Sequence, residues 1–390
     1  MKKTITILGT ALLAVSAQAT MFLSHGPLQG ALAGGGSAAP QDSSWIKMNP
    51  AGLVYVEDRL DYSIEGVFPT RTLSSSAAVS NPFVRNQENT SPSFLPNSTY
   101  VKKIDEDSTF ALGFLTTSGI MTKYDSPRTV FGALGNYDRQ IDYSVFKLSA
   151  IYAQKFDNGF SFAIGPNLNY SRARTNLANL LSPTGAQTSG GNQWDSAWGA
   201  GFQVAVMQQW EKLALSVSWT SRQWMQTFDK YRDVTLGPLD QPNVLQVGLA
   251  YKLNKELTWT MDYQLFNWKD VRALSATIEQ GGFGWSNHHF YKTGLIWQAT
   301  EDLKLLAGYS YAKAMTGPED VYANAFSPII TEHFLSCGAS YDIDEHWEVN
   351  GSYIHGFENH ITSDGKNALI HPTQVGVALD ILTFSVAYKF

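Results

Sequence analysis

The stretch ILTFSVAYKF occupies residues 381–390 and is apolar at every second position. Successive side chains of a β-strand point to opposite faces, so this alternation predicts a strand with one apolar face and one face of small or polar side chains. The apolar face carries Leu382, Phe384, Val386, Tyr388 and Phe390. We expect this strand to belong to an antiparallel sheet whose two faces meet different surroundings.

The same alternation recurs in other segments of the chain. In VLQVGLAYKL, residues 244–253, one face carries Val247 and Tyr251 while the other carries Gln246 and Lys252. Segments of about ten such residues are long enough to cross a bilayer at a tilt. The pattern therefore predicts a transmembrane β-barrel with apolar side chains toward lipid and polar side chains toward the lumen.

Short connections alternate with long ones that are rich in Ser, Gly, Pro and Asn, a rhythm typical of outer-membrane barrels. Counting the segments between them predicts an all-β antiparallel barrel of about fourteen strands, an even number that brings both ends to one side. We expect the strands to start near Leu60, Ser93, Ser108, Ile141, Phe160, Trp194, Leu213, Val244, Leu257, His288, Leu303, Thr331, Trp347 and Pro372.

Both ends of the chain carry features of export. Lys2 and Lys3 precede a short apolar stretch and the small-residue site Ala17-Gln18-Ala19, the layout of a signal peptide over residues 1–19. A membrane helix is the alternative, but the apolar stretch falls short of the ~20 residues that span a bilayer. At the other end, Tyr388 and Phe390 resemble the signal that the outer-membrane barrel assembly machinery reads.

Residues 20–58 differ from the rest because they contain GALAGGGSAAPQDSSW and lack the period-two alternation. Such a segment does not form a membrane strand. A barrel of this strand number encloses a wide lumen, so we expect residues 20–58 to form a hatch that plugs it and residues 59–390 to form the barrel. A disordered periplasmic tail is the alternative.

Composition excludes several classes of function. The net charge is −6 and no basic stripe is present, which argues against binding of nucleic acid. The single cysteine, Cys337, leaves no internal disulfide. The eight histidines form no pattern of metal ligands, and no motif pairs a nucleophile with His, so we expect no metal, no cofactor and no enzymatic activity.

The chain resembles the FadL family of outer-membrane channels for long-chain fatty acids and aromatic hydrocarbons. The resemblance rests first on the small-residue hatch with Asp42 and the triplet Asn49-Pro50-Ala51, followed directly by a barrel. Segments similar to those of the family follow in order: FLPNSTYVKKIDED, STFALGFLTTSGI, NLNYSRART, LTWTMDYQLFNW and ITEHFLSCGASYDI.

The resemblance implies passive uptake of hydrophobic compounds through the outer membrane of a Gram-negative bacterium, with lateral release into the bilayer. Long-chain fatty acids are the expected substrates, and aromatic hydrocarbons are the alternative. The implied surroundings are outer-membrane lipid and lipopolysaccharide. A structural barrel whose loops bind a partner, without transport, is a further alternative, as is a lipid hydrolase.

The resemblance also implies roles for particular residues. Phe22 corresponds to an apolar residue that reaches into the ligand pocket, although it could equally lie in a frayed terminus. The hatch triplet has a structural role. Ser118 and Gly119 lie where the family's third strand kinks to open the wall, whereas a glycine in a strand can also simply relieve crowding.

Basic residues are the expected partners of a substrate carboxylate. Arg172 and Arg174 match a family motif associated with the ligand's carboxylate, and a guanidinium is well suited to that task. An ion pair with an acidic neighbour is the alternative for both arginines. Lys313, on the eleventh strand, is a further candidate for binding ligand.

Overall fold

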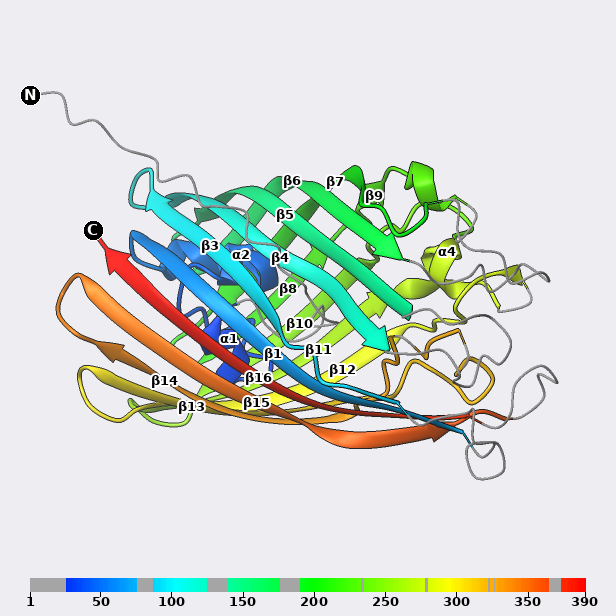
Figure 1. Cartoon of the computed structure of the whole chain (residues 1–390). Coiled ribbons are helices and arrows are strands. Elements are labelled where there is room, and N and C mark those ends of the chain that lie inside the picture. Colours follow the sequence, from blue (N-terminus) through cyan, green and yellow to red (C-terminus); the bar gives the residue numbers. More distant parts are fainter. Residues whose placement is uncertain are drawn as a thin grey trace, which may run out of the picture.

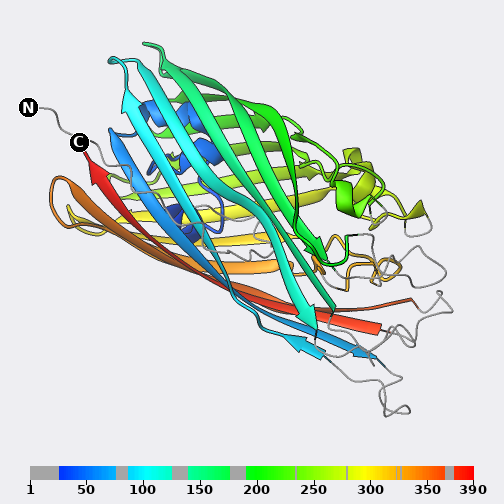
Figure 2. The same ribbon diagram turned by 45° about the horizontal axis from the view of Figure 1, so that its top comes forward.

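The computed structural model describes residues 26–75, 87–124, 139–175, 190–232, 235–277, 280–321, 323–325, 327–364 and 373–390. Within them, fourteen long antiparallel strands form a closed barrel (Figures 1 and 2). The strands are β1 (Arg59–Ser75), β3 (Ser93–Lys103), β4 (Ser108–Tyr124), β5 (Arg139–Lys155), β6 (Phe160–Thr175), β7 (Asp195–Gln209), β8 (Leu213–Thr220), β10 (Asn243–Lys252), β11 (Leu257–Asn267), β12 (His288–Gln298), β13 (Leu303–Ala312), β14 (His333–Asp342), β15 (Trp347–Thr362) and β16 (Thr373–Lys389).

The prediction of an all-β antiparallel barrel of about fourteen strands is confirmed. Two short additions, β2 (Gln87–Asn89) and β9 (Trp224–Met225), extend the sheet by pairing with β1 and β7. The predicted strand starts agree closely, and the largest differences are Ile141 against Arg139 and Thr331 against His333. The described residues contain no helix long and apolar enough to cross a membrane.

Pairing of the first strand with the last closes the barrel, from Arg59 opposite Lys389 to Ser75 opposite Thr373. The outer face of β16 carries the apolar set from Leu382 to Phe390, and all five side chains are exposed. The alternate residues Thr383, Ser385 and Ala387 are buried on the lumenal side. The period-two alternation therefore separates a lipid face from a lumenal face.

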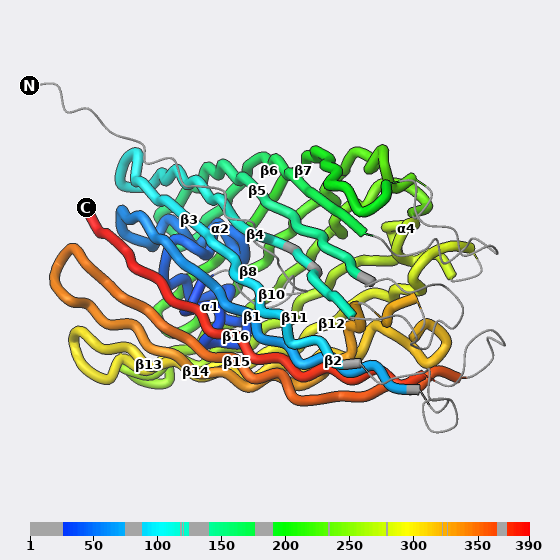
Figure 3. Tube along the Cα trace, in the orientation of Figure 1, coloured from blue at the N-terminus to red at the C-terminus, as the bar shows by residue number. Residues whose placement is uncertain are grey.

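The lumen holds residues 26–58, which form α1 (Pro27–Ala31), α2 (Trp45–Met48) and the 3-10 helix η1 (Pro50–Tyr55). Figures 1 to 3 show these helices inside the barrel, at the end that carries the short turns. Leu28, Leu32, Trp45, Ile46 and Leu53 are fully buried against small wall residues such as Ala111, Ala163 and Ala250. Burial of a large apolar side chain contributes about 1.5–3 kcal/mol, so this contact holds the hatch firmly.

Candidate transport pathway

The triplet Asn49-Pro50-Ala51 fixes the turn between α2 and η1. The Asn49 side-chain amide donates to the carbonyl of Ser37 at 3.0 Å, and its oxygen accepts from the backbone N–H of Ala51 at 3.2 Å. Pro50 occupies the first position of η1, where a missing N–H costs nothing. Ser161 of β6 donates to the carbonyl of Ala51 at 2.8 Å, which ties the triplet to the wall.

Asp42 lies in the buried interior of the hatch, 2% exposed. Its carboxylate accepts a hydrogen bond from the Ser44 backbone at 2.9 Å and another from the Ser44 hydroxyl. Burial raises the pKa of the Asp42 carboxyl to about 7, and the nearby Asp61 carboxylate adds to this effect. Asp42 therefore titrates near neutral pH.

This raised pKa predicts that docking of the hatch depends on pH. Stability from protonated Asp42 is fully present below the unfolded pKa of about 3.9 and is lost as the pH rises through the folded pKa. We expect protease protection of the hatch in the detergent-solubilised barrel to fall as the pH rises from about 4 to about 7 and to change little above that. Asp42→Asn, which does not titrate, should make protection of the hatch independent of pH over this range. An unchanged pH profile in this variant would show that Asp42 is not the titrating group.

Above the hatch, toward the long loops, buried aromatic and aliphatic side chains gather in the lumen. We call this set the lumenal apolar cluster; its rings are Phe266, Trp268, Trp285, Phe290 and Phe334. Trp268 and Trp285 meet edge to face with ring centroids 4.9 Å apart, and Phe266 and Phe290 do so at 6.0 Å. The cluster gives the long-loop end of the lumen an apolar, aromatic-rich interior.

The backbone hydrogen-bond ladder between β3 and β4 stops partway along the two strands. Their ladder runs only from Lys103 opposite Thr109 to Ser98 opposite Phe114, and no further pair joins them in the described residues. Along β4, a bulge lies between Thr116 and Ser118, where Thr117 is an extra residue relative to β5. We call this stretch, in which residues 93–97 and 115–119 share no backbone pairing, the wall opening.

The composition of β3 accounts for the end of the ladder. The carbonyl of Pro96 accepts from the Thr116 hydroxyl at 2.9 Å, so this edge of Pro96 faces β4. Since the N–H and C=O of one strand residue face the same neighbour, Pro96 lacks the donor that a ladder to β4 would need. The Asn97 side chain instead accepts from the backbone N–H of Thr116 at 2.8 Å.

The predicted gate residues Ser118 and Gly119 lie directly after this bulge, opposite Val145 and Ser144 of β5. The bulged residue itself is Thr117, one position earlier than Ser118. Sequence reasoning missed Thr117 because a bulge is visible in a sequence only as a break in apolar alternation. The Thr, Ser and Gly residues of this stretch have no such alternation. Pro96 was the available signal, because a proline inside a strand indicates an edge that does not hydrogen-bond to a neighbouring strand.

Two lysines lie in the lumen near the wall opening. Lys147 of β5 is 9% exposed and stands opposite Leu115 of β4, next to the bulge. Lys47 lies in α2, and burial lowers its pKa well below the ordinary value, with the charge of Lys147 as the next cause. No hydrogen bond or ion pair of either ammonium group is found among the described residues, and the carboxylate charge that acts on Lys47 is that of Glu65 of β1.

Sequence reasoning did not single out these lysines. The signal was present for Lys147, because it alternates in phase with Val145, Ser149 and Ile151, all buried on the lumenal face. Lys47 carried no such signal, since its position depends on how the hatch docks.

Arg172 and Arg174 lie on the outer face of β6. They continue the row of exposed residues Ile164 and Leu168, and both guanidinium groups stack on Trp194 at 4.7 Å from the ring centroid. Arg174 also donates to Asp142 at 2.5 Å. Both arginines therefore lie on the outer face of β6, and Arg174 makes the ion pair with an acidic neighbour that was the alternative to ligand binding.

Two predicted ligand residues remain, Lys313 and Phe22. Lys313 directly follows β13 and is exposed. Phe22 lies outside the described residues, as do residues 1–19.

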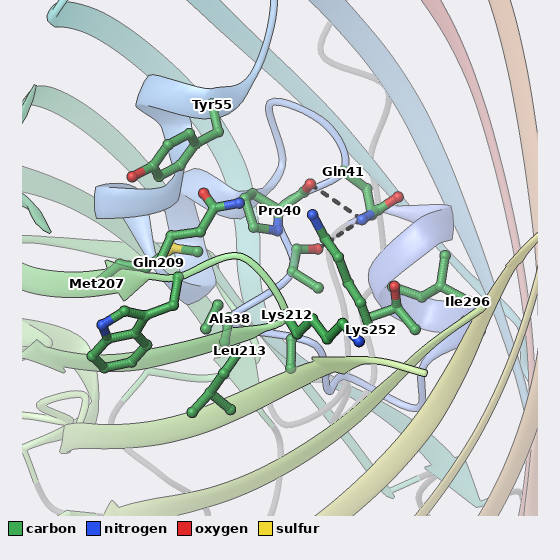
Figure 4. Close-up of a pocket in the computed structure, with 15 residues that line it drawn as sticks. Ala38, Pro40, Gln41, Tyr55, Met207, Gln209, Lys212, Leu213, Lys252 and Ile296 are labelled. Atoms are coloured by element: carbon green, nitrogen blue, oxygen red, sulfur yellow. Dashed lines mark hydrogen bonds between the residues drawn. The ribbon is translucent and has the colours of Figure 1, made fainter. Parts of the chain in front are cut away.

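A pocket of about 180 Å³ lies between the hatch and the wall at the short-turn end (Figure 4). Pro40, Gln41 and Tyr55 of the hatch and Lys212 and Lys252 of the wall border it. Gln41 donates to the carbonyl of Ala39 at 2.9 Å, which holds its side chain against the hatch. The hatch thus lies between this pocket and the lumenal apolar cluster.

Solved structures share this architecture at low sequence identity. The Pseudomonas putida toluene transporter TodX matches with a TM-score of 0.74 and 15% identity, covering 94% of this chain and 99% of that chain. A Pseudomonas aeruginosa FadL homologue matches with a TM-score of 0.72 and 13% identity, covering 96% and 100%. The Ralstonia pickettii toluene transporter TbuX gives 0.66 and 14%, covering 94% and 98%.

At these identities the similarity shows the shared fold. In the search of curated proteins, no sequence matches the chain. The family model for outer membrane protein transport proteins (OMPP1/FadL/TodX) matches residues 8–390, which is nearly the whole chain. The chain therefore belongs to the OMPP1/FadL/TodX family of outer-membrane transport proteins.

Proposed function

We propose that this protein is a passive outer-membrane channel for long-chain fatty acids, which leave the lumen sideways through the wall opening. The lumenal apolar cluster supplies an apolar path, the hatch supplies a floor, and the wall opening lies beside that floor. Release into lipid keeps apolar surface out of water, at about 25 cal/mol per Å². The route therefore needs no energy source.

The observation that carries the choice of fatty acids is the pair of lumenal lysines, Lys47 and Lys147. The Lys147 side chain is buried without a hydrogen-bond or ion-pair partner among the described residues, which is costly, and a carboxylate headgroup would supply that partner through charge-assisted hydrogen bonds. Lys147 stands opposite Leu115, next to the bulge. A fatty acid held there would have its tail free to reach the bilayer through the wall opening.

Aromatic hydrocarbons are the second candidate. The lumenal apolar cluster is rich in aromatic rings, which suit a flat neutral ligand. Arg172 and Arg174 lie outside the lumen, so they offer no carboxylate contact there. TodX and TbuX, which share the fold, are described as toluene transporters.

Both ends of the chain have a part in the proposed export and transport. Residues 1–19 would be removed on export, and Phe22 would reach into the ligand path. Tyr388 and Phe390 would be read by the barrel assembly machinery, and the exposed apolar band would lie among outer-membrane lipid and lipopolysaccharide.

Uptake in Gram-negative cells lacking their own fatty-acid channel tests the proposal. We expect faster uptake of labelled oleate than in empty-vector cells. Lys147→Met should reduce this gain about tenfold or more at low oleate, because a hydrogen bond to a charged group contributes about 1.5–3 kcal/mol. The matched control is Lys313→Met, an exposed lysine that should leave oleate uptake unchanged.

Labelled toluene, measured in the same cells, separates the two candidates. Faster uptake of toluene without oleate would replace fatty acids by aromatic hydrocarbons. If neither rises although the barrel is folded in the membrane, the protein is not a channel for these compounds and a loop-binding role is favoured.

A further inference from the structure

A buried charged pair on the barrel wall holds the glycine-rich turn of the hatch. Asp262 of β11 accepts the backbone N–H of Gly36 at 2.6 Å and that of Ser37 at 3.0 Å, one on each carboxylate oxygen. Lys292 of β12 donates to the carbonyl of Gly34 at 2.8 Å. The two side chains thus bind three backbone groups of one turn, the carbonyl of Gly34 and the N–H groups of Gly36 and Ser37.

The pair is positioned by the sheet. Asp262 and Lys292 are direct cross-strand partners and are only 2% and 3% exposed. Gln246 donates to Asp262 at 3.2 Å, and Gln264 accepts from Lys292 at 2.7 Å and donates to Gln246 at 3.1 Å. These amides hold both charged groups in the orientation that meets the hatch.

The turn is shaped to meet this pair. Gly36 has a φ of +85°, a conformation that residues with a side chain rarely adopt. A β-carbon on Gly35 would lie 3.3 Å from the Asp262 carboxylate and 3.3 Å from the Lys292 β-carbon. The sequence Gly34-Gly35-Gly36 therefore lets bare backbone approach the wall closely enough for the three hydrogen bonds.

We propose that Asp262 and Lys292 form a clamp that keeps the hatch docked while substrate leaves through the wall opening. Hydrogen bonds to buried charged groups are among the strongest in proteins, and breaking one leaves its partner buried and unsatisfied. The hatch is then a fixed floor. Loss of the clamp opens the wide lumen to water and ions.

Conductance of the purified full-length barrel in a planar bilayer with KCl tests the clamp. We expect Asp262→Asn, which keeps the shape but places an amide group against a backbone donor, to raise the conducting fraction about tenfold or more. Lys292→Met should act in the same direction through a separate substitution. Asp380→Asn, the same change on the outer face of β16, is the matched control and should remain as closed as the parent.

A disulfide separates loss of the clamp from general misfolding. The hydroxyls of Ser37 and Ser216 of β8 lie 2.8 Å apart, so cysteines at both positions would place their sulfurs close to bonding distance. Cys337→Ala first removes the native thiol, which lies on the outer face. In this background we expect the disulfide to close Asp262→Asn barrels again and a reductant to reopen them.

The same disulfide tests whether the floor stays in place during transport, and this arm rests on the proposed function. Uptake of oleate should be unchanged when the hatch is bonded to the wall. Conductance requires no substrate, so a failed clamp and a failed transport proposal give different results. The clamp is overturned if both clamp variants stay closed, if the disulfide fails to close Asp262→Asn, or if the disulfide stops uptake that the reduced protein supports.

Discussion

Deletion of Thr117 is expected to abolish uptake of hydrophobic compounds while the barrel still folds. Thr117 is the extra residue of the β4 bulge, and Thr116 and Ser118 already stand opposite consecutive residues of β5, Phe146 and Val145. Without Thr117, every later residue of β4 keeps its partner on β5. The strand then loses its local bend, so residues 115–119 should pack against residues 93–97 of β3 even though Pro96 still offers no N–H to β4.

The measurement is uptake of labelled oleate and toluene, with heat-modifiable electrophoretic mobility as the test of folding. Thr117→Ala is the matched control, because it keeps the bulge and removes only the side chain, and it should transport as the parent does. Parent-level uptake by a folded deletion variant would show that substrate does not leave between β3 and β4.

Gly308→Ala is expected to displace the hatch from the lumen. Gly308 of β13 faces the hatch, and an added β-carbon would lie 2.4 Å from the Leu32 carbonyl carbon and 2.6 Å from the Leu32 α-carbon. Both atoms are backbone, so the contact is not relieved by rotating a side chain. Overpacking of this kind typically costs about 1–3 kcal/mol, and the hatch must move or the strand must bend.

Protease digestion of the detergent-solubilised barrel checks this expectation. Cleavage within residues 26–58 should become fast in Gly308→Ala, while the wall strands stay protected. Gly351→Ala is the matched control, since its β-carbon would meet nothing closer than Phe384 at 3.5 Å. Equal protection of the hatch in both variants would mean that the wall does not need glycine at position 308.

These two variants act on different parts of the same route. The Thr117 deletion closes the side exit and leaves the floor in place, whereas Gly308→Ala disturbs the floor and leaves the side exit open. The Thr117 deletion should therefore lose uptake of hydrophobic substrate without conducting ions. Gly308→Ala should conduct ions and keep the side exit for uptake.

Much of the fold could be predicted from the sequence. The alternation in segments such as residues 381–390 assigns strands, faces and order, because every residue of a membrane strand faces either lipid or lumen. The small-residue segment before Arg59 was separable for the same reason, since it lacks that alternation. Local composition therefore carries the strand count and the position of the hatch segment in the chain.

The pathway itself was less accessible. Arg172 and Arg174 were expected to contact ligand, yet they lie on the outer face with Trp194. Near strand ends both faces become polar, so the alternation no longer tells which face a charged residue occupies. Lys47 and Lys147 were missed because an isolated lysine forms no motif. Whether such a lysine can bind a ligand depends on the residues that the fold places around it.

The sequence by itself determined the membrane-strand pattern, the even strand number and the presence of a distinct segment before the first strand, because these follow from local alternation of polarity. Only the tertiary structure decided how that segment is held. Gly36 and Asp262 lie 226 residues apart in the chain, and the hydrogen bond between them arises only once strands and hatch are assembled. The wall opening is likewise a property of two strands together, since it depends on where the pairing of β3 with β4 stops.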